Sequence, residues 1–220
     1  MRAVFVHGSG KLGAAAWPGL SDEEFVFVTR GGFEGEPERT DFAADARRVN
    51  DAVGDGAHVV AASYGGIAAL RAAESGIVRS LVLVEPAAFS LSRGLPATEA
   101  HIAAVDPVMR TWDTTDAATF AVALLTALGV PDAVAPPFPL AETWRLQLAP
   151  WHAELDAGVI ARVPTLVITG NWNAEYEELA GRLVELGASH QHLEGHGHAA
   201  HEHPEFENTA RTFWKMSTGV

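Results

Sequence analysis

The sequence contains no cysteine, very little lysine and no long hydrophobic run. The absence of cysteine excludes disulfides, thiolate catalysis and metal sites with cysteine ligands. Lysine occurs only at Lys11 and Lys215, and the formal net charge is −13, so we expect no basic stripe and no nucleic-acid partner. No apolar run approaches the roughly 20 residues that span a bilayer, and the first run is too short for a signal peptide. These features predict a cytoplasmic protein with no membrane partner.

The length and the acidic balance narrow the remaining choices. A chain of 220 residues is expected to bury roughly 70% of its unfolded surface, which suffices for one substantial domain with a modest insertion. The acidic excess favours solubility, and it favours neutral or cationic small-molecule substrates because anions are repelled at long range. The sequence leaves the oligomeric state open.

Short apolar runs alternate with helical patterns along the chain. The runs predict buried strands at residues 3–6, 25–28, 59–62, 81–84, 165–168 and 191–193. Helical spacing predicts helices over 42–53 and 176–186, and Pro204 opens a last one. This alternation predicts an α/β fold, with a doubly wound, mostly parallel sheet that has helices on both faces.

One long interval breaks the alternation. Residues 87–150 carry helical patches, tryptophans and a proline-rich piece between two predicted strands. An insertion of this length is more typical of a lid than of a loop. We therefore expect a small helical cap at 87–150, inserted before the penultimate strand into a core made of residues 1–86 and 151–220.

The segments that follow the predicted strands are the place to search for a site. In an open parallel sheet, ligands bind beyond the carboxyl ends of the strands. These segments are His7-Gly8-Ser9-Gly10, Ser63-Tyr64-Gly65-Gly66, Glu85-Pro86, Gly170-Asn171-Trp172-Asn173 and Gly195-His196-Gly197-His198. We expect their side chains to meet at one edge of the sheet.

Ser63 stands between an apolar run and a run of small residues. The segment Ala61-Ala62-Ser63-Tyr64-Gly65 follows the GxSxG pattern of a nucleophile elbow, except that alanine replaces the first glycine. Such a turn needs small residues because strand and helix pass closely, and alanine meets that demand in part. The segment alone also fits an ordinary turn with a capping serine, so its context has to decide.

The two ends of the chain supply that context. With His7-Gly8 after the first strand, Ser63 after the third and Gly197-His198 after the last, the sequence resembles the α/β-hydrolase superfamily, as a serine esterase-like member. The resemblance implies that Ser63 is the nucleophile and His198 the general base. It further implies an oxyanion hole formed by the backbone amides of Ser9 and Tyr64, and no cofactor.

The acid that would support the histidine is the least certain member of the site. The superfamily usually carries an aspartate after the penultimate strand, and Asn173 occupies that position here. An asparagine lacks the charge that stabilises an imidazolium, and this loss costs about 10⁴ in rate in a serine protease. Some members carry the acid one strand earlier, where Glu85 stands. Glu85 is our preferred acid, and Glu175 and Asn173 remain alternatives.

Histidines cluster near the end of the chain, at positions 190, 192, 196, 198, 201 and 203. The segment His196-Gly197-His198-Ala199-Ala200-His201 is similar to the HxHxDH motif of metallo-β-lactamases, but alanine replaces the aspartate. We therefore expect no metal, and we interpret the cluster as surface histidines around one catalytic residue. His196 is the competitor of His198 for that role.

Several ring side chains are candidates for the wall of a substrate pocket. They are His7, Trp112, Trp144, Trp151 and Trp172. Tryptophan more often packs than recognises a ligand, and we assign Trp17 and Trp214 to the core.

Glycines near the first strand allow another interpretation. Gly8, Gly10 and Gly13 match the GxGxxG fingerprint of dinucleotide-binding proteins, but no acidic residue ends the second predicted strand. Arg30 follows that strand and would suit a phosphorylated ribose. A Rossmann oxidoreductase therefore remains an alternative.

The hypothesis that follows is a serine hydrolase. It would act on a carboxylic ester of a small, neutral and partly apolar substrate through an acyl-enzyme. Two alternatives keep the same scaffold. One is a lyase or a hydrolase of carbon–carbon bonds, and the other is a catalytically silent small-molecule binding protein, which Asn173 in place of the usual acid would explain. The sequence leaves the substrate and the pathway open.

Overall fold

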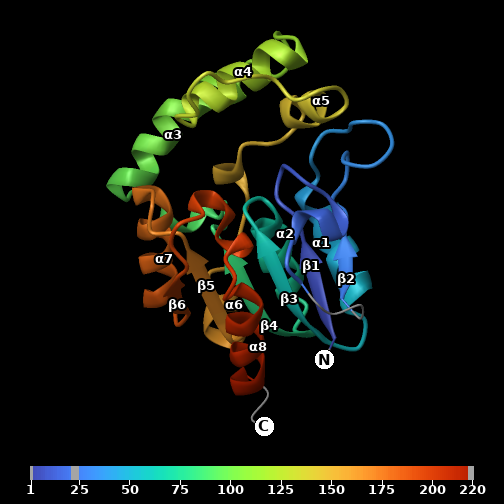
Figure 1. The fold of residues 1–220 in the computed structure, drawn as a ribbon, viewed down its shortest axis with the longest axis vertical. Helices are drawn as coiled ribbons and strands as arrows, with labels where there is room; N and C mark the ends of the chain where they lie inside the picture. Colours follow the sequence, from blue (N-terminus) through green and yellow to red (C-terminus); the bar gives the residue numbers. More distant parts are fainter. Residues whose placement is uncertain (1, 21–24, 218–220) are drawn as a thin grey trace.

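Six parallel strands form one open sheet within residues 2–20 and 25–217, the part of the chain that the computed structural model describes (Figure 1). Their spatial order is β2 (Val26–Val28), β1 (Ala3–Val6), β3 (Ala57–Ala62), β4 (Val78–Val84), β5 (Thr165–Thr169) and β6 (Ser189–His192). Every neighbouring pair is parallel. The predicted parallel α/β fold is confirmed.

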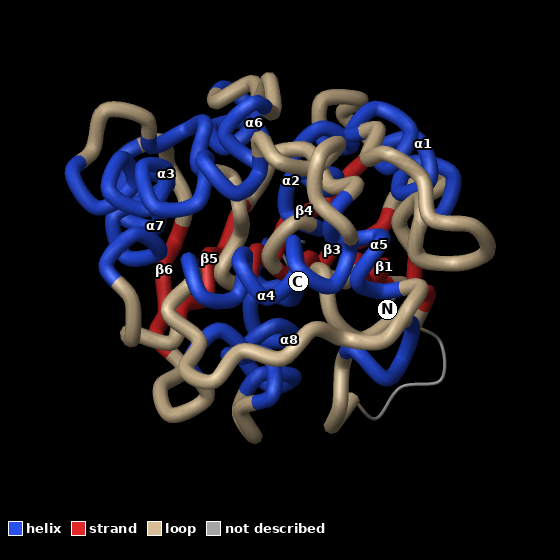
Figure 2. The backbone as a smooth tube through the Cα atoms, turned by 90° about the horizontal axis from the view of Figure 1, so that it is seen from above, coloured by secondary structure: helices blue, strands red, loops and turns tan. Residues whose placement is uncertain are grey.

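Helices cover both faces of this sheet. One face carries α1 (Phe42–Val53), α2 (Gly65–Ala73), α6 (Gly158–Arg162) and α7 (Ala174–Glu185), and the other carries α8 (Phe206–Ser217) (Figure 2). Successive strand residues point to opposite faces, and β4 shows this clearly. Leu81 and Leu83 belong to the first core, whereas Val82 and Val84 belong to the second. Two apolar layers therefore hold the sheet rigid.

Local sequence accounts well for α1 and less well for β6. Helix α1 has the predicted bounds, because the Asp41 carboxylate accepts hydrogen bonds from the amides of Ala43 and Ala44 and Gly54 ends the helix with a φ of 58°. Strand β6 begins two residues earlier than predicted. Its side chains are largely exposed because it is an edge strand, so no buried pattern marks its start.

Most of the chain between β4 and β5 lies over the carboxyl ends of the strands (Figure 1). It contains η2 (Phe89–Ser92), α3 (Pro96–Met109), α4 (Ala117–Ala127), α5 (Leu140–Arg145) and η3 (Pro150–His152). We call residues 87–150 the inserted segment. Short 3₁₀ helices also follow β1 and β6, namely η1 (Gly13–Ala16) and η4 (Gly197–Glu202).

Among the described residues, each helix is too short or too polar to cross a bilayer.

Candidate active site

Ser63 occupies the sharp turn between β3 and α2. Its φ of 50° lies in the left-handed region, which costs a residue other than glycine about 1–3 kcal/mol. Strand β4 and the residues after it hold the turn. The Ser63 amide donates to the Val84 carbonyl at 3.0 Å, and the Ser63 carbonyl accepts from the Ala87 amide at 2.9 Å. The strained turn places the serine side chain at the carboxyl edge of the sheet.

Small residues around Ser63 are required by close backbone contacts. A Cβ atom on Gly65 would lie 2.5 Å from the Val6 carbonyl oxygen. A Cβ atom on Gly66 would lie 2.8 Å from the Pro86 Cβ atom. Neither neighbour can move easily, so both positions after the turn need glycine. Ala61, which replaces the first glycine of the pattern, lies fully buried within β3.

His198 lies in η4, beyond the end of β6. Its Nδ1 atom is 3.5 Å from Oε2 of Glu85, and its ring centroid is 5.1 Å from that of Tyr176. The histidine side chain is 44% exposed, whereas the glutamate is fully buried. His198 and Ser63 line the same cavity, which has a volume of about 330 Å³. The ring therefore lies between a buried carboxylate and an open cavity.

Glu85 ends β4 and is fixed by hydrogen bonds. Its φ of 43° is also in the left-handed region. Oε1 accepts from the Gly170 amide at 2.6 Å, and Oε2 accepts from the Trp172 indole at 3.2 Å. Glu85 is therefore both a strand-end carboxylate bound to a loop and the acidic neighbour of His198.

Glu175 is paired with a different histidine. Its Oε1 atom is 3.1 Å from Nδ1 of His101, and the two side chains are only 12% and 9% exposed. Burial acts to raise the pKa of Glu175, but hydrogen bonds from His101, from its own backbone amide and from Asn173, together with the charge of His101, outweigh burial and lower the net pKa. Asn173 precedes α7 without capping it and lines the cavity. Within the described residues, the carboxylate in contact with His198 is thus that of Glu85.

His101 is a cavity residue that sequence reasoning missed. It lies in α3, within the inserted segment, and lines the cavity together with Glu175. Its ring packs against Phe89 at a centroid distance of 4.6 Å. No motif or strand end accompanies it in the sequence, so no local signal could have found it. His196, the competitor of His198, lines neither of the two cavities described here.

The backbone amides of Ser9 and Tyr64 face no protein acceptor. Both residues line the cavity, and neither amide donates a hydrogen bond to another group in the described part of the chain. The inserted segment holds the Ser9 loop in place. The Trp144 indole donates to the Ser9 carbonyl at 2.5 Å, and the Gln147 amide donates to the Ser9 hydroxyl at 3.0 Å. Two free donors near Ser63 are what an oxyanion hole requires.

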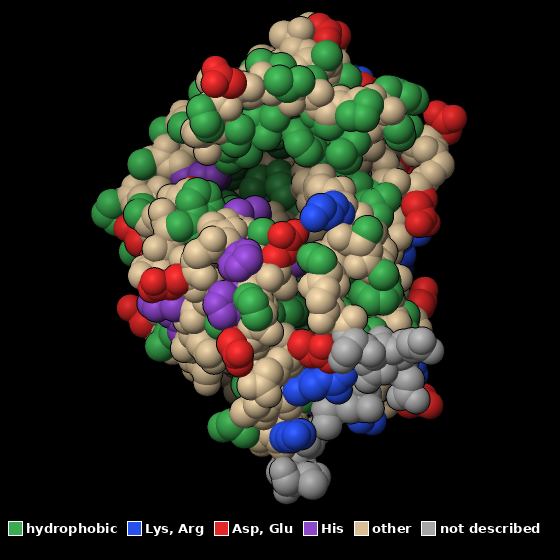
Figure 3. Space-filling model, viewed as in Figure 1, with side chains coloured by type: hydrophobic (Ala, Val, Ile, Leu, Met, Phe, Trp, Pro, Cys, Tyr) green, Lys and Arg blue, Asp and Glu red, His purple; other side chains and the backbone are tan. Residues whose placement is uncertain are grey.

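The wall of the cavity is mostly apolar. The space-filling view shows a hollow below α3 and α4, with hydrophobic side chains above it and within it, and histidine, acidic and basic side chains along its lower edge (Figure 3). Among the predicted wall residues, Trp144, Trp151 and Trp172 line this cavity. Trp112 does not line it and instead packs under the Arg39 guanidinium, 3.5 Å from the ring centroid. The inserted segment therefore supplies much of the apolar wall.

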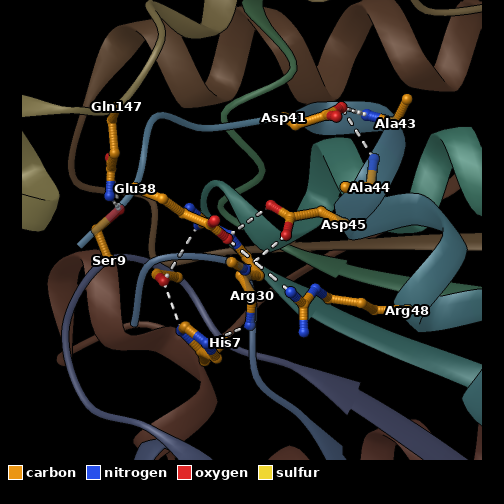
Figure 4. A network of polar contacts seen from close by, with 12 residues as sticks. His7, Ser9, Arg30, Glu38, Asp41, Ala43, Ala44, Asp45, Arg48 and Gln147 are labelled. Atoms are coloured by element: carbon orange, nitrogen blue, oxygen red, sulfur yellow. Dashed lines mark hydrogen bonds and ion pairs between the residues drawn. The ribbon is translucent and has the colours of Figure 1, made fainter. Parts of the chain in front are cut away.

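His7 lies below the site, in a buried polar network with Arg30 and Asp45 (Figure 4). It lines a second cavity of about 220 Å³, which also reaches Ser63 and His198. The His7 Nε2 atom accepts from the Arg30 amide at 3.0 Å, and Nδ1 donates to the Gly8 carbonyl at 2.7 Å. Burial and the nearby Arg30 charge lower the pKa of His7 to about 4. The ring is therefore neutral and holds the loop that leads to Ser9.

Arg30 is engaged by the protein itself. It is 2% exposed, and its guanidinium lies 3.4 Å from the Asp45 carboxylate and 3.3 Å from the Gly8 carbonyl. A cofactor phosphate would have to break this ion pair, which is costly in a buried environment. The contacts do not support the dinucleotide-binding interpretation of Arg30.

The comparison with protein families covers nearly the whole chain. The model of the alpha/beta hydrolase family matches residues 3–208. No curated protein matches this sequence.

Solved structures share the fold at low sequence identity. MenH from S. aureus is 16% identical over 99% of this chain and 94% of its own, with a TM-score of 0.64. NosK from Streptomyces actuosus is 20% identical over 99% and 98%, with a TM-score of 0.62. The carboxylesterase CesB from Bacillus subtilis is 16% identical over 100% and 84%, with a TM-score of 0.60. At these identities the likeness shows the fold alone.

Proposed function

Because this chain belongs to the alpha/beta hydrolase family, we propose that it is a serine hydrolase that cleaves a carboxylic ester through an acyl-enzyme. One observation carries the proposal. Ser63, held in a left-handed turn, lines the same cavity as His198, whose Nδ1 atom lies 3.5 Å from the buried Glu85 carboxylate. A hydroxyl, an imidazole and a carboxylate in this order constitute a nucleophile, a base and an acid that orients the base.

Each group then has a defined part in the reaction. Ser63 Oγ attacks the ester carbonyl carbon while His198 Nε2 accepts the hydroxyl proton. The amides of Ser9 and Tyr64 donate to the oxyanion of the tetrahedral intermediate. His198 returns the proton to the departing alcohol, which leaves the acyl group on Ser63. A water molecule, deprotonated by His198, then attacks the acyl-enzyme and releases the acid.

Glu85 supports this cycle through charge. Its carboxylate accepts a hydrogen bond from the Nδ1–H group of His198 and stabilises the imidazolium that forms in each half-reaction. The Gly170 amide and the Trp172 indole keep the carboxylate in place. The departure from the usual pattern at Asn173 is thereby compensated, because the acid comes from the end of β4.

The wall of the cavity suggests the kind of substrate. Apolar side chains from the inserted segment, among them Val105, Leu124 and Leu128, form much of the wall. His101 and Glu175 add a polar pair to it. We propose that residues 87–150 are the cap of the enzyme, and that the substrate is small, neutral and mainly apolar with one hydrogen-bonding group. A volume of about 330 Å³ suits a small molecule.

A fluorophosphonate probe tests the nucleophile, and a panel of p-nitrophenyl esters tests the reaction. We expect one covalent adduct on the wild-type chain, none on Ser63→Ala, and a wild-type level on Ser75→Ala. Ser75 is a matched control because it is exposed and lies just beyond α2. Hydrolysis of at least one ester should disappear in Ser63→Ala alone.

Other outcomes would contradict the proposal at separate points. Absence of labelling on the wild-type chain would favour a silent binding protein. Labelling of Ser63 without hydrolysis of any ester would retain the nucleophile but reject ester cleavage, and would favour lyase or carbon–carbon chemistry.

A further inference from the structure

A carboxylate and two imidazoles meet at the edge of the sheet, outside the candidate active site. Glu177 lies in the first turn of α7, and His190 and His192 lie on β6. One ligand atom from each side chain lies within 4.8 Å of the others. None of the three residues lines either of the cavities that contain Ser63. This trio is therefore a separate cluster of potential metal ligands.

The fold explains why these side chains converge. Residues separated by two positions on a strand point to the same face, so His190 and His192 both face α7. Their ring centroids are 4.6 Å apart. Helix α7 packs on β6 and presents Glu177 to the same space. Edge strand β6 and helix α7 thus supply the three groups from fixed backbones.

The distances within the cluster suit a small tetrahedral ion. Oε2 of Glu177 lies 2.9 Å from Nε2 of His192 and 3.8 Å from Nε2 of His190. Ligands bound to Zn²⁺ at 2.0–2.1 Å in a tetrahedron are about 3.3 Å from one another. The two observed distances lie on either side of that value, so small rotations of the side chains would complete the geometry.

The surroundings of the three groups are also suitable. Oε1 of Glu177 is buried and has no hydrogen-bond partner within the described chain. The His192 side chain is 44% exposed, which gives an ion access from solvent. The Thr169 hydroxyl, 2.7 Å from Nε2 of His190, would lose that contact to the ion.

We propose that Glu177, His190 and His192 bind one Zn²⁺ ion, with water as the fourth ligand. Imidazole nitrogen and carboxylate oxygen are ligands that Zn²⁺ accepts, whereas Mg²⁺ prefers oxygen alone. The sequence alone predicts no metal because its one segment similar to a metal-binding motif, from His196 to His201, lacks the aspartate of that motif. The fold assembles a different set, in which Glu177 of α7 completes the pair on β6. The ion would join the edge strand to α7.

Zinc titration of the full chain tests this site. The chelator-treated protein is titrated with Zn²⁺ in competition with a chromophoric chelator. We expect one ion per chain, with a Kd of about 10 µM or tighter, and a higher melting temperature in the presence of Zn²⁺. Glu177→Gln and His192→Asn should each weaken binding at least about tenfold and abolish the rise in melting temperature.

His203→Asn is the matched control, because His203 belongs to another close histidine pair, with His196 at a ring distance of 5.6 Å. This variant should bind Zn²⁺ as the wild-type chain does. Binding weaker than about 100 µM would overturn the proposal. So would tight binding that survives Glu177→Gln and His192→Asn, or tight binding that disappears in His203→Asn. Circular dichroism confirms that each variant is folded.

Discussion

Two histidines line the cavity, each paired with a glutamate, and the two pairs differ in what surrounds them. In the first, His198 is 44% exposed and Glu85 is fully buried. In the second, His101 and Glu175 are 9% and 12% exposed. Of these four residues, only His198 lines the second cavity, which also contains Ser63. Identical side-chain types therefore occupy two different environments around the same cavity.

The difference shows how position, rather than residue type, assigns a role. Glu85 is held by donors from the loop after β5, and its histidine lies on a loop with an open face. The His101 and Glu175 side chains join α3 to α7 instead. An exposed imidazole backed by a buried charge suits proton transfer. A largely enclosed pair suits the attachment of the inserted segment and the recognition of a polar substrate group.

The largest expected effect comes from removing the charge of Glu85, and the same change at Glu175 is its comparison. Glu85→Gln should lower kcat/KM about 10³-fold, because the imidazolium of His198 loses its counter-charge. Glu175→Gln should lower it less than about tenfold, because His101 takes no part in the proton transfers. Both values come from steady-state kinetics on an ester that the wild-type chain hydrolyses.

The reverse order of effects would reassign the two pairs. A greater loss in Glu175→Gln than in Glu85→Gln would make Glu175 the functional acid. A comparable loss in Asn173→Ala, with Glu85→Gln fully active, would instead identify Asn173 as the residue that orients the histidine.

His7 is a third histidine, and it differs from His198 and His101 because its charged neighbour is a cation, Arg30. His7 has a pKa of about 4 through burial and Arg30, whereas a histidine in the unfolded chain titrates near 6.5. Below pH 6.5 the unfolded chain therefore binds a proton that the folded chain excludes, and stability falls as the pH falls toward 4. From pH 7.5 to pH 5 this histidine should cost about 2 kcal/mol.

Urea unfolding at the two pH values measures this loss. His7→Gln should show a decrease in the free energy of unfolding that is about 2 kcal/mol smaller than that of the wild-type chain. His152→Gln changes an exposed histidine and should follow the wild-type chain. Equal decreases in all three proteins would show that His7 is protonated in the folded state.

The smallest effect concerns the enclosed pair. His101→Phe keeps a ring against Phe89 but removes the hydrogen-bonding nitrogens. We expect KM to rise about tenfold for a hydroxylated ester, corresponding to one lost hydrogen bond, with KM for a purely apolar ester unchanged. Fluorophosphonate labelling of Ser63 should proceed at the wild-type rate. An equal rise in KM for both esters would show that the pair serves only in packing. The melting temperature of the variant would measure the loss of packing separately from the loss of substrate binding.

Much of the fold could be predicted because its causes are local. Apolar runs marked β1, β3, β4 and β5, and Asp41 and Gly54 marked the ends of α1. The predicted starts are two residues late for β3, three for β4 and two for β6, and in β6 the exposed side chains of an edge strand account for the difference. Ser63 and Glu85 could be proposed as site residues because each directly follows an apolar run that marks a buried strand.

The other members of the site depend on long-range contacts. His101 has no local signal, since α3 meets α7 only in the folded chain. Trp112 and Trp144 both lie on the inserted segment, and only the folded backbone decides that one packs on Arg39 and the other lines the cavity. No spacing within the sequence distinguishes them.

By itself, the sequence determined the alternation of strands and helices, the turn at Ser63 and the residues that end each strand. These follow from backbone preferences and from the burial of apolar side chains. Only the tertiary structure decided which carboxylate meets which histidine. Glu85 faces His198, Glu175 faces His101 and Glu177 faces His192. Charge pairing depends on distances of a few ångströms between segments far apart in the chain, and packing of the sheet and its helices sets those distances.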